Sequence, residues 1–210
     1  MPNARASSVW VSQTQAEWAD EVRGIVVKAG ITVESGPTPG ENALCIVTPL
    51  GADATTSCVA QGLDPKRTVA LDCLPGGGGK NARRTLMTTP LTTAAMRDAA
   101  HALFAADGTA VSVIHDSAGF VAQRILACIV NIGCDIAQQR VARPADIDRA
   151  VTLGLGYPKG PLAFGDALGA RKVLAILEAM QDFYGDPRYR PSPWLKRRAL
   201  LGVSLLTEEA

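Results

Sequence analysis

The segment from Asp116 to Leu195 constrains the fold of this chain more than any other part. It contains D-S-A-G-F-V-A-Q-R, a long apolar stretch, A-D-I-D-R-A, G-Y-P-K-G-P and finally Y-R-P-S-P-W-L. The Gly and Pro residues of G-L-G-Y-P-K-G-P enforce tight turns between packed helices. The sequence therefore predicts an all-helical second half, with helices over residues 117–140, 144–153, 162–168, 170–184 and 191–201.

The first of these predicted helices, residues 117–140, would be about 36 Å long at 1.5 Å per residue. Asp116 or Ser117 is the expected cap of its N-terminus. Its apolar residues recur at helical spacing and share one face. They are Val121, Ile125, Ile129, Ile132 and Ile136.

The first half of the chain alternates between short apolar runs and helical patterns. Strands are expected over residues 9–12, 31–34, 43–48, 68–74, 83–89 and 110–115, and helices over 15–28, 53–61 and 92–106. Such alternation is typical of an α/β fold with a mainly parallel sheet. We place the domain boundary near Asp116, which gives an α/β domain over residues 1–115 and a helical domain over residues 116–210.

Composition excludes several classes of function. A net charge of +1 provides no general attraction to nucleic acid or to an anionic membrane. The five cysteines include no C-x-x-C pair and only two histidines occur, so neither a metal site nor a disulfide framework is expected. The most apolar run, Ile125–Cys134, is interrupted by Asn131, whereas a membrane span needs roughly 20 apolar residues. A cytoplasmic protein with free thiols is expected.

The helical half resembles the C-terminal domain of the 3-hydroxyacyl-CoA dehydrogenases. D-S-A-G-F-V-A-Q-R-I is similar to that family's D-x-P-G-F-V-x-N-R-[LI], and D-I-D-R-A-V-T-L-G-L-G-Y-P-K-G-P is similar to its D-I-D-x-A-[MV]-x-x-G-x-G-Y-P-x-G-P. The resemblance implies a Rossmann-like parallel sheet followed by an all-α dimerisation domain, which forms a homodimer and completes an acyl-CoA site. The activity of the family is the NAD-dependent oxidation of 3-hydroxyacyl-CoA to 3-oxoacyl-CoA.

The resemblance also implies that the family's catalytic groups have been replaced. Asp72 stands at the position of the catalytic His, Thr85 at that of the catalytic Glu, and Gln123 at that of the active-site Asn. An imidazole base takes the 3-hydroxyl proton in this family, whereas an unperturbed Asp has a pKa of about 4. The α/β half therefore resembles a degenerate copy, and no catalytic role is assigned to these positions.

A dinucleotide site is not expected in the α/β half. The G-x-G-x-x-G turn should follow the first strand, but no glycine lies between Ser12 and Asp20. Glu34 sits where a ribose-binding acid would, which is a weak match without the glycines. The run Gly76–Gly79, followed by Lys80, does not fit a phosphate loop because Leu74 and Asn81 occupy positions that need Gly and Ser or Thr. No cofactor is expected in this chain.

Basic residues leave one binding alternative open. Lys80, Arg83 and Arg84 are candidates for the phosphates of coenzyme A. A second basic cluster consists of Arg188, Arg190, Lys196, Arg197 and Arg198. For both clusters a solvated face is the default interpretation, and a coenzyme A phosphate site is the alternative.

Three functions follow from this sequence. The first is a non-catalytic structural or dimerisation module. The chain resembles the second, degenerate module of bacterial 3-hydroxyacyl-CoA dehydrogenases of the phenylacetate-catabolism type. The second is an active oxidoreductase that recruits Asp72, His115 or Gln123. The third is a module that binds acyl-CoA without turnover.

Overall fold

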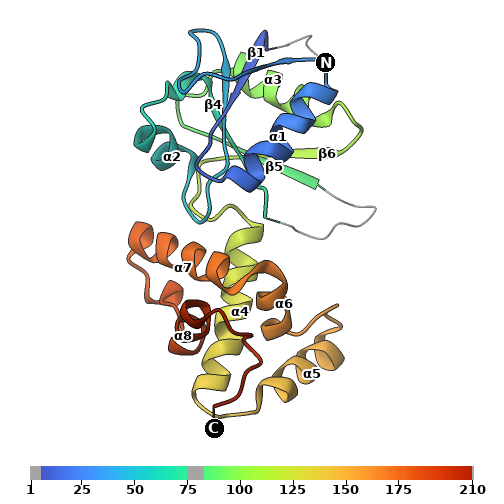
Figure 1. The fold of residues 1–210 in the computed structure, drawn as a ribbon, viewed down its shortest axis with the longest axis vertical. Helices are drawn as coiled ribbons and strands as arrows, with labels where there is room; N and C mark the ends of the chain where they lie inside the picture. Colours follow the sequence, from blue (N-terminus) through green and yellow to red (C-terminus); the bar gives the residue numbers. More distant parts are fainter. Residues whose placement is uncertain (1–5, 75–82, 210) are drawn as a thin grey trace. The chain divides into compact units, whose positions relative to one another are not determined.

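A computed structural model describes residues 6–74 and 83–209 of the 210-residue chain. The chain forms two compact units, Met1–Phe120 and Val121–Ala210. Unit 1 is an α/β domain and the described part of unit 2 contains only helices (Figure 1). The run Gly76–Gly79 and Lys80 lie outside the described residues.

A six-stranded sheet forms the centre of unit 1. Its strands are β1 (Ser8–Val11), β2 (Thr32–Glu34), β3 (Leu44–Val47), β4 (Thr68–Leu71), β5 (Arg83–Thr88) and β6 (Ala110–Ile114). Their order is β2-β1-β3-β4-β5-β6, and every pair is parallel except β4 with β5. The direction of strand order reverses between β1 and β3, which is the switch point where doubly wound sheets bind ligands. The predicted mainly parallel α/β fold is confirmed.

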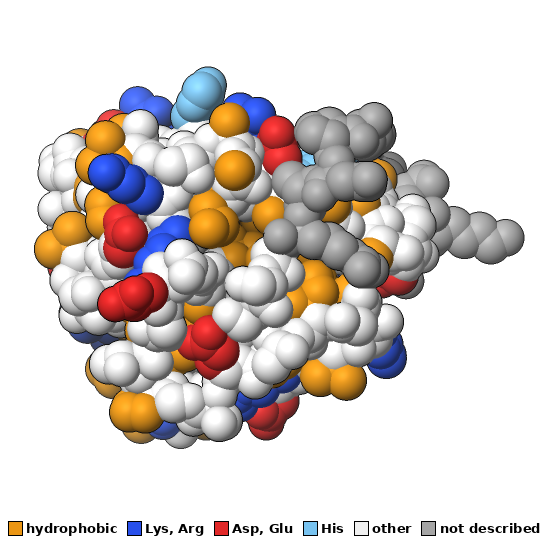
Figure 2. Space-filling model, turned by 90° about the horizontal axis from the view of Figure 1, so that it is seen from above, with side chains coloured by type: hydrophobic (Ala, Val, Ile, Leu, Met, Phe, Trp, Pro, Cys, Tyr) orange, Lys and Arg blue, Asp and Glu red, His pale blue; other side chains and the backbone are white. Residues whose placement is uncertain are grey.

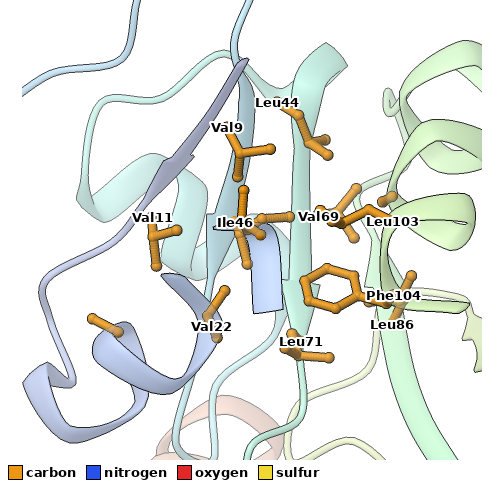
Figure 3. Close-up of a cluster of buried hydrophobic side chains, with 13 residues drawn as sticks. Val9, Val11, Val22, Leu44, Ile46, Val69, Leu71, Leu86, Leu103 and Phe104 are labelled. Atoms are coloured by element: carbon orange, nitrogen blue, oxygen red, sulfur yellow. The ribbon is translucent and has the colours of Figure 1, made fainter. Parts of the chain in front are cut away.

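Helices α1 (Ala16–Lys28), α2 (Ala54–Ala60) and α3 (Ala94–Ala105) flank this sheet. Alternate residues of each strand point to opposite faces, so the apolar clusters on the two faces are separate. Figure 3 shows the larger cluster, in which Ile46 and Val69 pack with Phe104 of α3 and with Val22 of α1. The second cluster contains Ala54 of α2 with Val47 and Ala70. Burial of both strand faces accounts for their near-continuous apolar sequences.

The segment before the long helix differs from the prediction. Helix α4 spans Ala122–Gln138 and does not begin at Ser117. Gly119 and Phe120 have φ values of 78° and 47°, and this left-handed backbone cannot continue a right-handed helix. Phe120 is 1% exposed within the second apolar cluster, so its burial offsets the strain of that conformation.

Asp116 caps a different helix from the one predicted. Its carboxylate accepts hydrogen bonds from the backbone N–H groups of Ala54 at 2.8 Å and Thr55 at 3.1 Å. These groups belong to the first turn of α2, where Asp53 also accepts from the N–H of Thr56. The two carboxylates together satisfy three N–H groups that have no partner within the helix. The predicted role of Asp116 or Ser117 as the cap of the long helix was therefore wrong.

Unit 2 is built around α4. Helices α5 (Pro144–Leu155), α6 (Pro161–Leu168), α7 (Ala170–Tyr184) and α8 (Pro193–Leu201) all pack against it. Figure 1 shows α4 running through the unit, with α7 and α8 on one side and α5 and α6 on the other. Pro144, Pro161 and Pro193 each occupy the first helical position, where a missing N–H costs nothing. The observed starts of α6 and α8 therefore lie at prolines that the sequence marks.

The D-I-D and K-G-P motifs meet at the start of α6. The carboxylate of Asp148 accepts hydrogen bonds from the backbone N–H groups of Leu162 at 2.7 Å and Ala163 at 2.8 Å. Gly160 precedes that turn, and a Cβ atom at this position would overlap Asp148. The motif therefore holds two helices in close contact through a capped helix end.

The C-terminal segment after α8 is held against the helices by specific contacts. Asp166 accepts hydrogen bonds from the backbone N–H of Leu205 at 2.8 Å and from the Ser204 hydroxyl. Trp194 donates from its indole nitrogen to the carbonyl of Leu205, whose side chain is buried. Arg198 donates to the carbonyl of Thr207 at 2.9 Å and 2.6 Å. Arg198 is 4% exposed, so its assignment to a solvated basic face was wrong.

Candidate functional site

Two of the positions that the sequence singles out meet at the end of strands β4 and β5. The antiparallel register pairs Leu71 with Leu86, so the next pair outward is Asp72 with Thr85. The backbone N–H of Asp72 donates to the carbonyl of Thr85 at 3.0 Å. The carboxylate of Asp72 accepts from the backbone N–H of Leu74 at 3.0 Å, which is a local turn contact.

This pair offers a carboxylate and a hydroxyl and no imidazole. His115 follows β6, in which Ser112 is paired with Thr85. His115 therefore lies three residues further along the strand, about 10 Å away at 3.3 Å per residue. Gln123 belongs to α4 of unit 2, where it is fully buried. Within unit 1, the structure brings Asp72 and Thr85 together and keeps His115 apart from them.

Polar side chains fill the turn between β1 and α1. Ser12 is fully buried, and its hydroxyl donates to the side-chain oxygen of Gln61 at 2.6 Å and contacts the hydroxyl of Thr14 at 2.9 Å. Helix α1 then begins without a side-chain cap. A dinucleotide site needs glycine here, because the pyrophosphate lies against the bare backbone at the start of the helix. The side chains of this turn do not fit that requirement.

Glu34 already has partners for its carboxylate. It accepts a hydrogen bond from the Ser8 hydroxyl at 2.6 Å and another from the backbone N–H of Gly40 at 2.7 Å. These two hydrogen bonds lower the pKa of Glu34, with the Gly40 N–H as the larger cause. The carboxylate ties the end of β2 to its own loop. A ribose hydroxyl would have to compete with both of these contacts.

A cavity of about 410 Å³ lies beside this turn. Its lining includes Gln13 and Thr14 after β1, the segment Pro37–Pro39 after β2, and Arg67. The guanidinium of Arg67 donates to the carbonyls of Gly40 and Ala43 and pairs with Asp64 at 3.5 Å. The guanidinium of Arg67 is therefore already engaged by backbone carbonyls and by Asp64. A phosphate that entered the cavity would have to compete with these contacts.

The basic residues proposed for coenzyme A phosphates have different environments. Arg84 forms a two-point ion pair with Asp107 at 2.9 Å and 2.8 Å and donates to the carbonyl of Phe104. The hydrogen bonds from Arg84 hold the pKa of Asp107 well below its usual range. Arg83 donates to the hydroxyl of Ser112 at 2.8 Å. A phosphate would have to displace Asp107 from Arg84, so the geometry does not favour a phosphate role for Arg84. The phosphate role of Arg83 and Lys80 stays a prediction, and Lys80 lies outside the described residues.

Burial disfavours the thiolate form of two of the five cysteines. All five cysteines are free. Burial raises the pKa of Cys45 to about 11 and that of Cys134 to about 12, so both are protonated and unreactive near neutral pH. Across residues 6–74 and 83–209, His, Cys, Asp and Glu side chains form no group that could hold a metal ion.

Two further expectations concern the charge of the surface and the absence of a membrane span. Figure 2 shows one face of the molecule, on which acidic, basic and apolar side chains are interspersed. Within the described part of the chain, the helices are too short or too polar to cross a membrane.

Comparison with known proteins identifies the helical unit. Residues 119–204 match the family model described as "3-hydroxyacyl-CoA dehydrogenase, C-terminal domain". The helical unit is therefore similar to the C-terminal domain of the 3-hydroxyacyl-CoA dehydrogenase family. That family consists of NAD-dependent oxidoreductases, as the motifs of the helical half predict.

Two curated relatives match less than half of this chain. The 3-hydroxyadipyl-CoA dehydrogenase of Escherichia coli is 46% identical over 94 residues, which cover 45% of this chain and 20% of that protein. A probable 3-hydroxybutyryl-CoA dehydrogenase of Bacillus subtilis is 38% identical over 94 residues, covering 45% of this chain and 32% of that protein. The matched part therefore spans between a fifth and a third of these 3-hydroxyacyl-CoA dehydrogenases.

Solved structures extend the likeness to unit 1. The 3-hydroxybutyryl-CoA dehydrogenase of Escherichia coli K12 superposes with a TM-score of 0.65 at 33% identity, covering 74% of this chain and 31% of that one. The (S)-3-hydroxybutyryl-CoA dehydrogenase PaaH1 of Ralstonia eutropha gives a TM-score of 0.73 over 97% of this chain and 71% of that one. At 23% identity the latter match demonstrates the shared fold alone. The predicted order, a Rossmann-like sheet followed by a helical domain, is confirmed.

Proposed function

We propose that this chain is a non-catalytic module of the 3-hydroxyacyl-CoA dehydrogenase family that associates into a homodimer through its helical unit. The observation that carries the proposal is the pair Asp72 and Thr85. They face each other across β4 and β5. The sequence resemblance assigns these positions to the family's catalytic His and Glu, and neither a carboxylate nor a hydroxyl can replace an imidazole. The helical unit retains the family's motifs, whereas unit 1 has this altered pair.

The chemistry of the family reaction explains why this replacement matters. Oxidation of a 3-hydroxyl group requires a base that removes its proton near neutral pH, which is the role that the family gives to an imidazole. The carboxylate of Asp72 is also engaged by the backbone N–H of Leu74. His115 lies about 10 Å along the neighbouring strand from Thr85, so it is a poor substitute for the missing base.

The nucleotide side of the reaction supports the same proposal. The hydroxyl of Ser12 and the side chain of Gln61 occupy the turn in which a dinucleotide needs glycine. The carboxylate of Glu34 is held by Ser8 and Gly40. In this proposal the chain binds no nicotinamide cofactor, and the scaffold serves association only.

We further propose that this module corresponds to the second, degenerate module of dehydrogenases of the phenylacetate-catabolism type. The 46% identity to 3-hydroxyadipyl-CoA dehydrogenase of Escherichia coli over 94 residues supports this assignment. A cytoplasmic location accords with five free thiols, because reducing compartments preserve them.

A turnover assay tests the proposal. The purified chain is mixed with 3-hydroxybutyryl-CoA and NAD, and the absorbance of NADH is followed. We expect no NADH above a sample without protein. Turnover that disappears in Asp72→Asn would contradict the proposal and would assign the reaction to the recruited carboxylate. An intact family dehydrogenase in the same mixture serves as the positive control.

A further inference from the structure

A cavity of about 640 Å³ lies beside the C-terminal end of α4, within unit 2. Its walls come from three segments: the turn between α4 and α5, the start of α8 and the residues that follow α8. Figure 1 shows the C-terminus of the chain next to the end of α4. Ligand sites commonly enclose about 300–1,000 Å³, so this volume is sufficient for a small molecule.

Two exposed arginines in the turn after α4, Arg140 and Arg143, line this cavity. Within residues 6–74 and 83–209, neither guanidinium forms a hydrogen bond or an ion pair. By contrast, Arg171 of α7 donates to the carbonyl of Ala199 at 3.0 Å. The donors of Arg140 and Arg143 are therefore available to a ligand, and the planar guanidinium matches the geometry of a carboxylate.

Carboxylates line the same cavity. They belong to Asp146 in the first turn of α5 and to Glu208 and Glu209 after α8. A carboxylate oxygen of Glu209 lies 3.9 Å from guanidinium nitrogens of both Arg197 and Arg198. In the part of the chain that the structure describes, Asp146 and Glu208 form no ion pair. A phosphate group would meet repulsion from these carboxylates, whereas a ligand with charges of both signs would complement the cavity.

The backbone of Arg140 has a conformation that favours glycine. Its φ is 55°, in the left-handed region. The backbone N–H groups of Arg140 and Val141 donate to the carbonyls of Ala137 at 3.0 Å and Ile136 at 3.1 Å, and these two bonds end α4. Glycine commonly occupies such a position because a Cβ atom is unfavourable there. An arginine at this position favours a role for its side chain outside the turn itself.

Apolar side chains also line the cavity. Val141 is 71% exposed, and Ala142 and Pro144 follow it in the chain. Trp194 contributes from the start of α8, and its indole N–H already donates to the carbonyl of Leu205. The indole therefore offers the cavity only the carbon atoms of its ring. These side chains favour an aliphatic group on the ligand, because its contact with them removes apolar surface from water.

We infer that this cavity binds a small aliphatic zwitterion, which is the chemistry of a free amino acid or of a short peptide. The carboxylate of the ligand contacts Arg140 and Arg143, and its ammonium group contacts Asp146 and Glu208. The aliphatic group lies against the apolar part of the lining. This inference goes beyond the proposed function, because it requires neither self-association nor the loss of turnover.

Titration calorimetry of the full chain provides the first test. The probes are leucine and leucyl-leucine, which carry both charges and differ in length. The matched controls are isocaproate, which is leucine without its ammonium group, and isoamylamine, which is leucine without its carboxylate. We expect saturable binding of a zwitterion and roughly tenfold weaker binding of both controls, because each control lacks one charged contact. Absence of saturable heat from both zwitterions at millimolar concentrations would overturn the inference, and so would equal affinity for isocaproate.

Arg140→Gly separates binding from folding. Glycine suits the left-handed turn, so this variant should unfold at a urea concentration no lower than that of the wild type. It should nevertheless bind the zwitterion roughly tenfold more weakly, because a guanidinium contact with the carboxylate is lost. Arg149→Ala is the matched control, because Arg149 is exposed on α5 and is not part of the cavity lining. It should bind the zwitterion as the wild type does.

Arg143→Ala keeps the test decisive if Arg140→Gly alters the fold. The side chain of Arg143 makes no capping hydrogen bond at the start of α5, so its removal leaves that helix end unchanged. This variant should also bind the zwitterion roughly tenfold more weakly. Glu208→Gln should weaken the binding of leucine without changing that of isocaproate. Wild-type affinity for the zwitterion in both arginine variants would overturn the assignment of this site.

Discussion

Gly160→Ala is expected to destabilise the helical unit by about 3 kcal/mol, since overpacking against a fixed neighbour and loss of a helix cap combine. The new Cβ would overlap the Cα, Cβ and Cγ atoms of Asp148, which include backbone and cannot move aside cheaply. Displacing Asp148 also removes the carboxylate that accepts from the N–H groups of Leu162 and Ala163. Urea unfolding followed by circular dichroism measures the free energy of unfolding.

Gly154→Ala is the matched control for that substitution. Gly154 belongs to the same glycine-rich motif but lies inside α5, and no atom lies within 4 Å of a Cβ built there. Alanine in a helix interior is favoured over glycine by about 0.5–1 kcal/mol, so this variant should be at least as stable as the wild type. Equal losses in the two variants would show that the close approach at Gly160 has no special role.

Arg198→Met is expected to destabilise the helical unit by about 3 kcal/mol, because hydrogen bonds to a buried charged group are lost and their acceptor stays behind. The guanidinium lies 3.1 Å from the centre of the Trp194 ring and donates to the carbonyl of Thr207. Burial lowers the pKa of Arg198, with Glu209 opposing this shift. Loss of the side chain should release the C-terminal segment, which hydrogen exchange at the backbone N–H of Leu205 detects.

The neighbouring residue provides the control for this prediction. The side chain of Arg197 is 60% exposed, and its nearest carboxylate oxygen, on Glu209, is 3.9 Å away. Exposed ion pairs contribute about 0–1 kcal/mol, so Arg197→Met should change stability by less than about 1 kcal/mol. Faster exchange at Leu205 in both variants alike would contradict a specific role for Arg198.

Local patterns were sufficient for most of the fold. The apolar runs of β3 and β4 and the helical periodicity of α7 depend on residues that are neighbours in the chain, and the structure confirms them. The start of α4 could not be found in this way. The side chain of Asp116 bonds to residues 61 and 62 positions earlier in the chain, and Phe120 adopts a left-handed backbone to reach the core of unit 1. Both depend on contacts that no local spacing contains.

In the candidate site too, some features follow from sequence motifs and others depend on residues that are distant in the chain. Motif resemblance located Asp72 and Thr85 separately, and the register of β4 with β5 places them opposite each other. The environments of basic and acidic residues depend instead on distant partners. Arg84 is held by Asp107, and Glu34 by Ser8, which lies 26 residues away. The composition gives the number of charged residues, but it does not reveal which of them already have partners.

Titration calorimetry with NADH tests the central claim most directly, because it measures binding whether or not any reaction occurs. The side chains of Ser12, Thr14 and Gln61 in the first turn of unit 1 predict no saturable heat at NADH concentrations that saturate an intact family dehydrogenase. Saturable binding with one NADH per chain, weakened by Glu34→Ala, would contradict the claim that this scaffold has lost its nucleotide site.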